Sequence, residues 1–185
     1  MMARTLGSAL RRMGRFAAAR RLDEDTMARD QRLRGDDHPD TLASAHYLAL
    51  DLRHLGEVET ARHLDRDTFT RRRRVLGQDH PRTLASASSL AIDLRELGDV
   101  QAACDLDKDT LARRRRVLGE DHPDTLDTAN NLAIDLRELG DLQATRDLHE
   151  DTLARRRRVQ GEDHPDTLDT ANNLAIDLNK LSEKY

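Results

Sequence analysis

The three residues Asp-His-Pro recur in this chain every 42 residues without drift. They begin at residues 37, 79, 121 and 163. Leu-Gly returns at 55–56, 97–98 and 139–140, and residues 119–136 are identical to residues 161–178. A fixed period of this length indicates stacked copies of one supersecondary unit, each packed mainly against its neighbours.

Each period predicts two helices joined by short turns. Pro123 suits a first helical turn, where its missing N–H would be unpaired in any case, and Asp121 or His122 caps the amides before it. Gly140 ends this first helix, because glycine adopts a left-handed cap conformation without steric cost. A second helix ends at Gly161, and the short connections require neighbouring helices to pack antiparallel. The apolar stripe of the first helix consists of Leu126, Ala129, Leu132, Ala133, Leu136 and Leu139.

The composition limits both the core and the partners. Aromatic residues make up 2% of the chain and charged residues 36%, so we expect a long, thin core of alanine and leucine. The net charge of −4 does not favour bulk attraction to nucleic acid or to an anionic membrane. No apolar run approaches the length of a membrane span. The single cysteine, Cys104, cannot form an internal disulfide, so we expect a reducing, cytoplasmic location.

The repeated histidines are interpreted as parts of turns. Zinc needs about four ligands that converge on one ion. The histidines of Asp-His-Pro lie one repeat apart, which is about 10 Å by ordinary helix packing. We therefore expect no metal site.

Runs of four arginines occupy residues 71–74, 113–116 and 155–158. Four consecutive helical residues point in four directions, so a run cannot form one basic face. Asp67 stands four residues before Arg71, a pairing worth a few tenths of a kcal/mol, and the spacing recurs at Asp109 and Asp151. We predict ion-pair ladders and no nucleic-acid site. The acids expected to pair across helices are Asp51, Asp93 and Asp135.

No arrangement in the sequence favours catalysis. The chain has no glycine-rich loop of the kind that binds phosphates, and Cys104 has no recurring histidine partner. Pairs of carboxylates are abundant, but the same pairs recur in every repeat, whereas an active site is normally singular. We predict a protein without catalytic residues and without a cofactor.

The packing residues resemble those of a tetratricopeptide repeat (TPR). The resemblance rests on Leu132-Ala133, Leu136 and Gly140 and, one repeat earlier, on Ala103, Leu106 and Leu111. The 42-residue period and the Asp-His-Pro turn are similar to the variety found in kinesin light chains and in bacterial regulators associated with STAND-type NTPases. One position departs from the family pattern, because Asp65, Asp107 and His149 stand where an aromatic residue is common. We expect more polar packing there.

The resemblance implies an all-α fold, a right-handed α-solenoid of antiparallel helix pairs with no β-sheet. We expect a single TPR-like solenoid over residues 1–185. Its predicted elements are a partial helix at 3–13, a helix at 15–34, helix pairs at 39–55 and 57–76, 81–97 and 99–118, and 123–139 and 141–160, and a capping helix at 165–182.

The resemblance also implies a binding face, because in this family the first helices line a concave groove. The residues implied there vary between repeats far more than the packing positions do. They are Tyr47, His54, Ser89, Glu96, Asp127, Asn131, Glu138, Asp169, Asn173 and Lys180.

The groove composition suggests the kind of partner. Asn131 and Asn173 each offer a donor and an acceptor to a peptide backbone, but they equally suit packing between repeats, and both roles stay open. Because acids such as Glu96 and Glu138 replace the Lys and Arg clamp of some relatives, we expect a neutral or basic protein or peptide, bound as an extended strand or a helix. The alternative is a self-assembling array, or a regulatory sensor array of a larger NTPase-containing bacterial system, associating through the solenoid ends.

Overall fold

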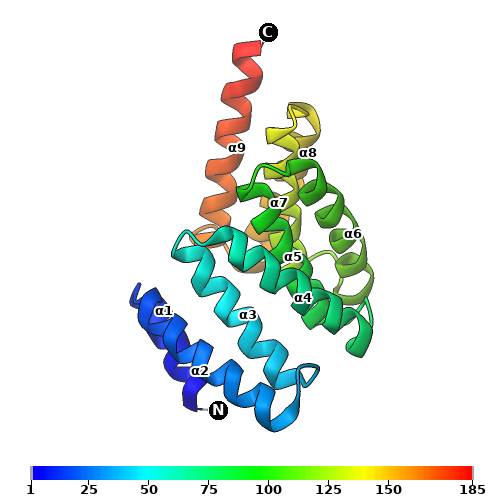
Figure 1. Ribbon diagram of the computed structural model, residues 1–185. Helices are drawn as coiled ribbons and strands as arrows, with labels where there is room; N and C mark the ends of the chain where they lie inside the picture. Colours follow the sequence, from blue (N-terminus) through cyan, green and yellow to red (C-terminus); the bar gives the residue numbers. More distant parts are fainter. Residues whose placement is uncertain (1, 185) are drawn as a thin grey trace. The chain divides into compact units, whose positions relative to one another are not determined.

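The computed structural model describes residues 2–184, which form nine α-helices and no β-strand (Figure 1). The helices are α1 (Met2–Arg12), α2 (Phe16–Arg34), α3 (Pro39–His54), α4 (Val58–Leu76), α5 (Pro81–Glu96), α6 (Val100–Leu118), α7 (Pro123–Glu138), α8 (Leu142–Gln160) and α9 (Pro165–Lys184). In the repeat, α3, α5, α7 and α9 are first helices, and α2, α4, α6 and α8 are second helices.

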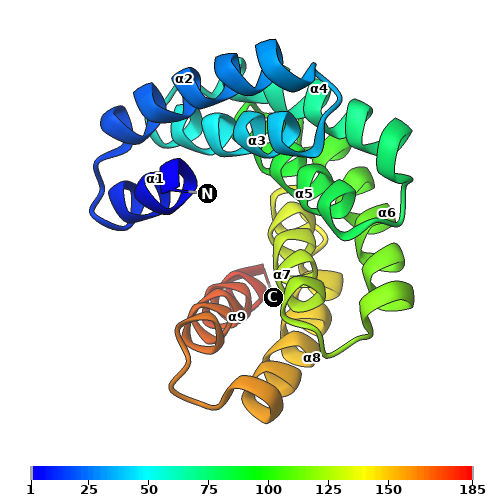
Figure 2. The ribbon, with the colours of Figure 1, turned by 90° about the horizontal axis from the view of Figure 1, so that it is seen from below.

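The chain divides into two compact units, Met1–Leu97 and Gly98–Tyr185, which we call unit 1 and unit 2. In unit 1, each helix from α1 to α5 packs against the next, and the first helices α3 and α5 also touch. In unit 2, α6 to α9 pack in the same way, and α7 touches α9 (Figure 2). Within each unit, consecutive helices are antiparallel, as predicted (Figure 1 and Figure 2). One continuous solenoid through both units stays a prediction.

A histidine ring caps the first helices. The Nδ1 atoms of His38, His80 and His122 each accept the backbone N–H two residues later, at 3.1 Å, directly before the proline of the first turn. The ring satisfies one of the amides that a helix start leaves without a partner. The choice left open between Asp121 and His122 is thus decided for the histidine.

The observed helix ends differ from the predicted ones by one or two residues. Second helices begin one residue later than predicted, because residues such as Asp141 stand at the N-cap, outside the helix. The first helix α7 ends at Glu138, one residue earlier, so Leu139 is exposed and does not extend the apolar stripe. Gly140 and Gly161 follow with φ of +85° and +96°, a region that side chains other than glycine rarely enter.

Each unit has its own small core. In unit 1, Leu48, Leu52 and Ala61 cluster with Met27 and Leu64. In unit 2, the cluster consists of Cys104, Leu111, Ala129 and Leu132, with Leu136 and Leu148 packed against it. Both clusters lie between first and second helices, so aliphatic side chains fill the space that aromatic residues occupy in many other domains.

Candidate functional site

Two of the predicted binding residues in unit 1 carry rings and lie on α3. Tyr47 is half-buried, and the Arg11 guanidinium lies 4.8 Å from the centre of its ring. His54 is exposed at the last turn of α3 and stacks on the Phe16 ring at a centroid distance of 4.2 Å. Both rings are thus held by residues of α1 and α2.

The other two predicted residues of unit 1 lie on α5 and differ in access. Glu96 is exposed at the end of the helix. Ser89 is only 9% exposed, and its backbone oxygen accepts a hydrogen bond from Arg53 at 3.1 Å. A contact between the Ser89 side chain and a partner stays a prediction.

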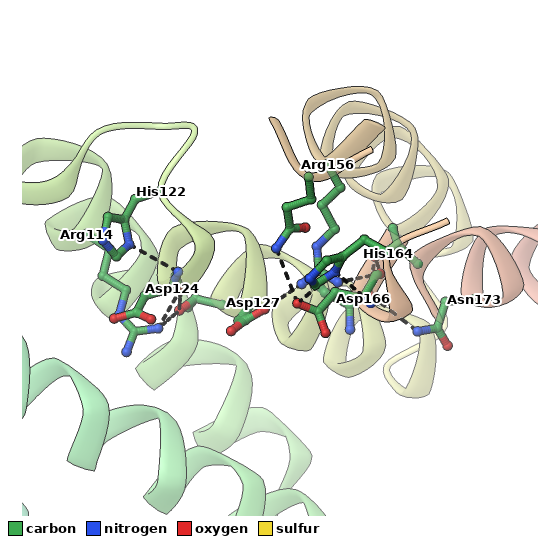
Figure 3. Close-up of polar contacts among 12 residues, drawn as sticks. Arg114, His122, Asp124, Asp127, Arg156, His164, Asp166 and Asn173 are labelled. Atoms are coloured by element: carbon green, nitrogen blue, oxygen red, sulfur yellow. Dashed lines mark hydrogen bonds and ion pairs between the residues drawn. The ribbon is translucent and has the colours of Figure 1, made fainter. Parts of the chain in front are cut away.

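In unit 2, Asn173 lies where two first helices meet. Its Nδ2 donates to Oδ1 of Asn130 on α7 at 3.4 Å, and Oγ1 of Thr170 donates to the same oxygen at 3.3 Å (Figure 3). Asn131 is also half-buried and has polar interactions of its own. The Asn130 contact supports the packing role for Asn173, and a ligand contact stays a prediction.

Asp127 is engaged by a neighbouring helix. Nη2 of Arg156, on α8, lies 2.5 Å from Oδ1 of Asp127 (Figure 3). The sequence places Asp127 among the acids of the groove but does not reveal its pairing with Arg156. Asp169, the equivalent residue on α9, is exposed, as are Glu138 and Lys180 at the ends of their helices. Asp127 is exposed as well, so the four charged residues predicted in unit 2 are all accessible, and Asp127 differs in being paired with Arg156.

Buried arginines hold successive first helices together. Arg72 is 3% exposed; its Nη2 donates to the Leu42 backbone oxygen on α3, and its Nη1 donates to Oγ of Ser86 on α5. In unit 2, Arg114 donates to the backbone oxygen of Asp124 and to Oγ1 of Thr128, both on α7 and both at 2.6 Å (Figure 3). The second arginine of each run is therefore buried and has a structural role. The sequence of the run does not distinguish it from the more exposed arginines beside it.

A buried pair of carboxyls lies beneath the surface of unit 1. Asp65 and Asp93 are both completely buried, and Nη1 of Arg53 donates to Oδ1 of Asp93 at 2.9 Å. Burial raises the pKa of Asp93 to about 7; Arg53 opposes this shift, and the neighbouring Asp65 adds to it. Neither Asp65 oxygen accepts a hydrogen bond from a described donor. A proton shared by the two carboxyls would satisfy them.

The same arrangement recurs one repeat earlier. Nη1 of Arg11 lies 2.6 Å from Oδ2 of Asp23 and 3.1 Å from Oδ2 of Asp51. Burial raises the pKa of Asp51 to about 6, against the effect of Arg11. The expectation that Asp51 and Asp93 pair across helices is confirmed, and their partners are Arg11 and Arg53 in the last turns of α1 and α3.

The last repeat replaces one carboxyl with a histidine. Nδ1 of His149 lies 2.5 Å from Oδ2 of Asp177, both side chains are completely buried, and Arg137 reaches Oδ1 of Asp177 at 3.2 Å. Burial lowers the pKa of His149 despite the neighbouring carboxylate. The predicted polar packing at residues 65 and 149 is confirmed. The 28-residue spacing from Asp65 to Asp93 and from His149 to Asp177 is the sequence signal that could have revealed these pairs.

The exposed ion-pair ladders are also as predicted. Arg71 binds Asp67 at 2.7 Å, and Arg74 binds Asp37 at 2.5 Å. These side chains are largely solvated, so each pair contributes at most about 1 kcal/mol. The equivalent pairs in unit 2 are Arg113–Asp109, Arg155–Asp151 and Arg158–Asp121.

The described part of the chain offers little else with reactive chemistry. No three His, Cys, Asp or Glu side chains among these residues are placed to hold a metal ion together. Cys104 is buried, and burial raises the pKa of its thiol, which makes it a poor nucleophile. Of the described helices, none has the length and apolar character needed to cross a membrane.

Comparison with known proteins identifies the family. The model of the tetratricopeptide repeat matches residues 1–73, 42–112, 83–155 and 127–185, which together span the chain. No curated protein sequence matches it.

Solved structures support the same assignment. Two structures of a Podosopora anserina protein, assigned as a kinesin light chain with nearly identical TPR-like repeats, are 26% identical and give TM-scores of 0.84 and 0.83. The match covers 98% of this chain and 86% of theirs. BtubC (BKLC) from P. vanneervenii, at 20% identity, shares the fold with a TM-score of 0.83 over 97% of this chain and 72% of its own.

The all-α fold of TPR helix pairs is thus confirmed, and TPR repeats generally mediate interactions between proteins. The chain belongs to the tetratricopeptide repeat family, a family of non-catalytic helical repeat scaffolds.

Proposed function

We propose that this chain is a non-catalytic scaffold that binds a neutral or basic peptide segment of a partner protein along its first helices. The observation that carries the proposal is a contrast on those helices. The buried residues recur from repeat to repeat: at equivalent positions, Asp51, Asp93 and Asp177 are all completely buried. The accessible position three residues further varies, as His54, Glu96, Glu138 and Lys180.

The charge of these positions favours a basic or neutral segment. Glu96 in unit 1 and Glu138 in unit 2 are both exposed at the last turn of a first helix. Asp127 contributes less, because Arg156 already neutralises it. Exposed carboxylates on a binding face raise the association rate of cationic partners and exclude anionic ones.

The proposal is tested with labelled synthetic dodecapeptides of net charge +4, 0 and −4, titrated with the full chain and followed by fluorescence anisotropy. We expect saturable binding of the first two classes and weaker binding of the third. The double variant Glu96→Gln/Glu138→Gln should weaken the basic peptides about three- to tenfold, since each exposed charge contributes up to about 1 kcal/mol.

The matched control is Glu59→Gln/Glu150→Gln. It makes the same chemical change at exposed positions of the second helices α4 and α8. We expect it to leave binding unchanged. Equal losses from both double variants, or no saturable binding of any peptide class, would contradict the proposal.

A further inference from the structure

Helices α7 and α9 begin with the same sequence but have different surroundings. Residues 119–136 and 161–178 are identical, so the two helices present the same side chains over these residues. Leu126 on α7 is 1% exposed, whereas its equivalent Leu168 on α9 is 50% exposed. Ala133 is completely buried, whereas Ala175 is exposed. One face of α9 therefore lacks the cover that the same face of α7 has.

Both α8 and α9 contact α7, and α8 makes the larger contact. Leu148 of α8 packs against the cluster that contains Ala129 and Leu132. Two turns further along α8, the buried Arg156 reaches the carboxylate of Asp127 at 2.5 Å. Leu148, Thr152 and Arg156 are spaced by four residues and so lie on one side of their helix. This side of α7 therefore binds a helix that offers an apolar side chain and an arginine.

The equivalent side chains of α9 are present, but no described helix packs over them. Leu168, Ala175 and Leu178 are exposed, and Asp169 is exposed and pairs with no arginine among the described residues. α8 packs on a different side of α9, where His149 meets Asp177. We call Leu168, Asp169, Ala175 and Leu178 the α9 face.

We propose that the α9 face binds an amphipathic helix of a partner protein that carries a leucine, a small residue and an arginine at four-residue spacing, the pattern that α8 presents to α7. The leucine of this helix covers the apolar part of the α9 face. Its arginine pairs with Asp169, as Arg156 pairs with Asp127.

A partner helix fits the α9 face better than a second copy of this chain does. The buried arginines that a copy could offer are already engaged within their own chain: Arg72 with Leu42, Arg114 with Asp124 and Arg156 with Asp127. The remaining second helix, α2, has Asp30 at the equivalent position. An aspartate there would face Asp169 with like charge, which is unfavourable.

A synthetic peptide of residues 141–160, labelled with fluorescein, serves as the probe helix for the full chain. We expect saturable binding by anisotropy. Leu168→Lys should weaken it at least tenfold. The control Val117→Lys changes an apolar residue of α6 that is also exposed, at 42% against 50% for Leu168, and should leave binding unchanged. Circular dichroism checks that both variants remain helical.

The charge pair is tested with a second peptide in which Arg156→Met removes the cation. Asp169→Asn should weaken the arginine peptide about fivefold and leave the methionine peptide unaffected. Equal effects on both peptides would remove the charge pair from the proposal. The probe carries one more arginine than acidic residues, so it also meets the charge requirement of the first-helix surface proposed above. Both titrations are therefore repeated in the Glu96→Gln/Glu138→Gln variant, and the binding that Leu168→Lys still weakens in that background is assigned to the α9 face.

Three results would overturn the proposal. The first is no saturable binding of the probe. The second is binding that Leu168→Lys does not weaken, which would mean that the peptide replaces α8 or binds elsewhere. The third is self-association of the unmodified chain, detected by sedimentation velocity and abolished by Leu168→Lys, which would make a second copy the occupant.

Discussion

The substitution Asp65→Asn tests the electrostatics of the buried carboxyl pair. The folded state raises the pKa of Asp93 from 3.8 to about 7, so the folded chain holds a proton that the unfolded chain releases at lower pH. Stability linked to this proton is present below pH 4 and is lost as the pH rises through 7. From pH 5 to the folded-state pKa of about 7 the pH rises by about two units, and above that value no further loss occurs. The free energy of unfolding therefore falls by about 3 kcal/mol between pH 5 and pH 8.

Asparagine at position 65 removes the like charge and offers an N–H to Asp93. Burial remains the larger cause of the raised pKa, so we expect the loss between pH 5 and pH 8 to shrink by about half and not to vanish. The variant should therefore be more stable than the unmodified chain at pH 8, by roughly 1–2 kcal/mol. A gain in stability from replacing a buried side chain is uncommon, which makes the prediction discriminating.

The assay is urea unfolding followed by far-ultraviolet circular dichroism at pH 5 and pH 8. Hydrogen exchange of peptides from α4 and α5 assigns the change to unit 1, since repeats do not all unfold together. Asp67→Asn is the control, because it alters an exposed carboxyl of the same helix and should leave the pH dependence unchanged. A stability that does not change from pH 5 to pH 8, or a slope that Asp65→Asn leaves as it was, would refute the reasoning.

Three further predictions concern His149, Gly161 and Arg72. Because burial lowers the pKa of His149, the unfolded chain takes up a proton below pH 6.5 that the folded chain does not bind. Hydrogen exchange should therefore show that α8 and α9 lose stability as the pH falls. The variant His149→Asp should reverse this pH dependence. Gly161→Ala should destabilise the protein by about 1–2 kcal/mol in urea unfolding although nothing lies within 4 Å of the added Cβ, because its φ of +96° strains any other residue. Arg72→Ala should lower stability by about 3 kcal/mol and Arg73→Ala by less than 1, since only Arg72 is buried; equal urea midpoints would contradict the structural role of the buried arginine.

The local parts of the fold could be predicted from the sequence, because each depends on a few adjacent residues. Pro123 and Gly140 mark a helix start and a helix end through their own backbone preferences, and the period repeats these signals in every copy. The pairing of Asp67 with Arg71 needs only the geometry of one helix. These elements required no knowledge of how distant helices meet.

Contacts between helices were harder to predict, because they depend on the register of one helix against another. The sequence does not show that Arg156 reaches Asp127 on α7, or that Asp65 meets Asp93 across α4 and α5. Ser89 was placed on the binding face by its repeat position, although the structure leaves it 9% exposed. The sequence also gives no sign of the division into two units, because the 42-residue period continues without a break past Leu97.

Binding of partners along the first helices is tested by hydrogen exchange of the full chain, with and without a saturating basic dodecapeptide from the anisotropy titration. We expect slower exchange in segments of α3, α5, α7 and α9 and unchanged exchange in α4, α6 and α8. Protection confined to the second helices, or spread equally over all helices, would contradict it.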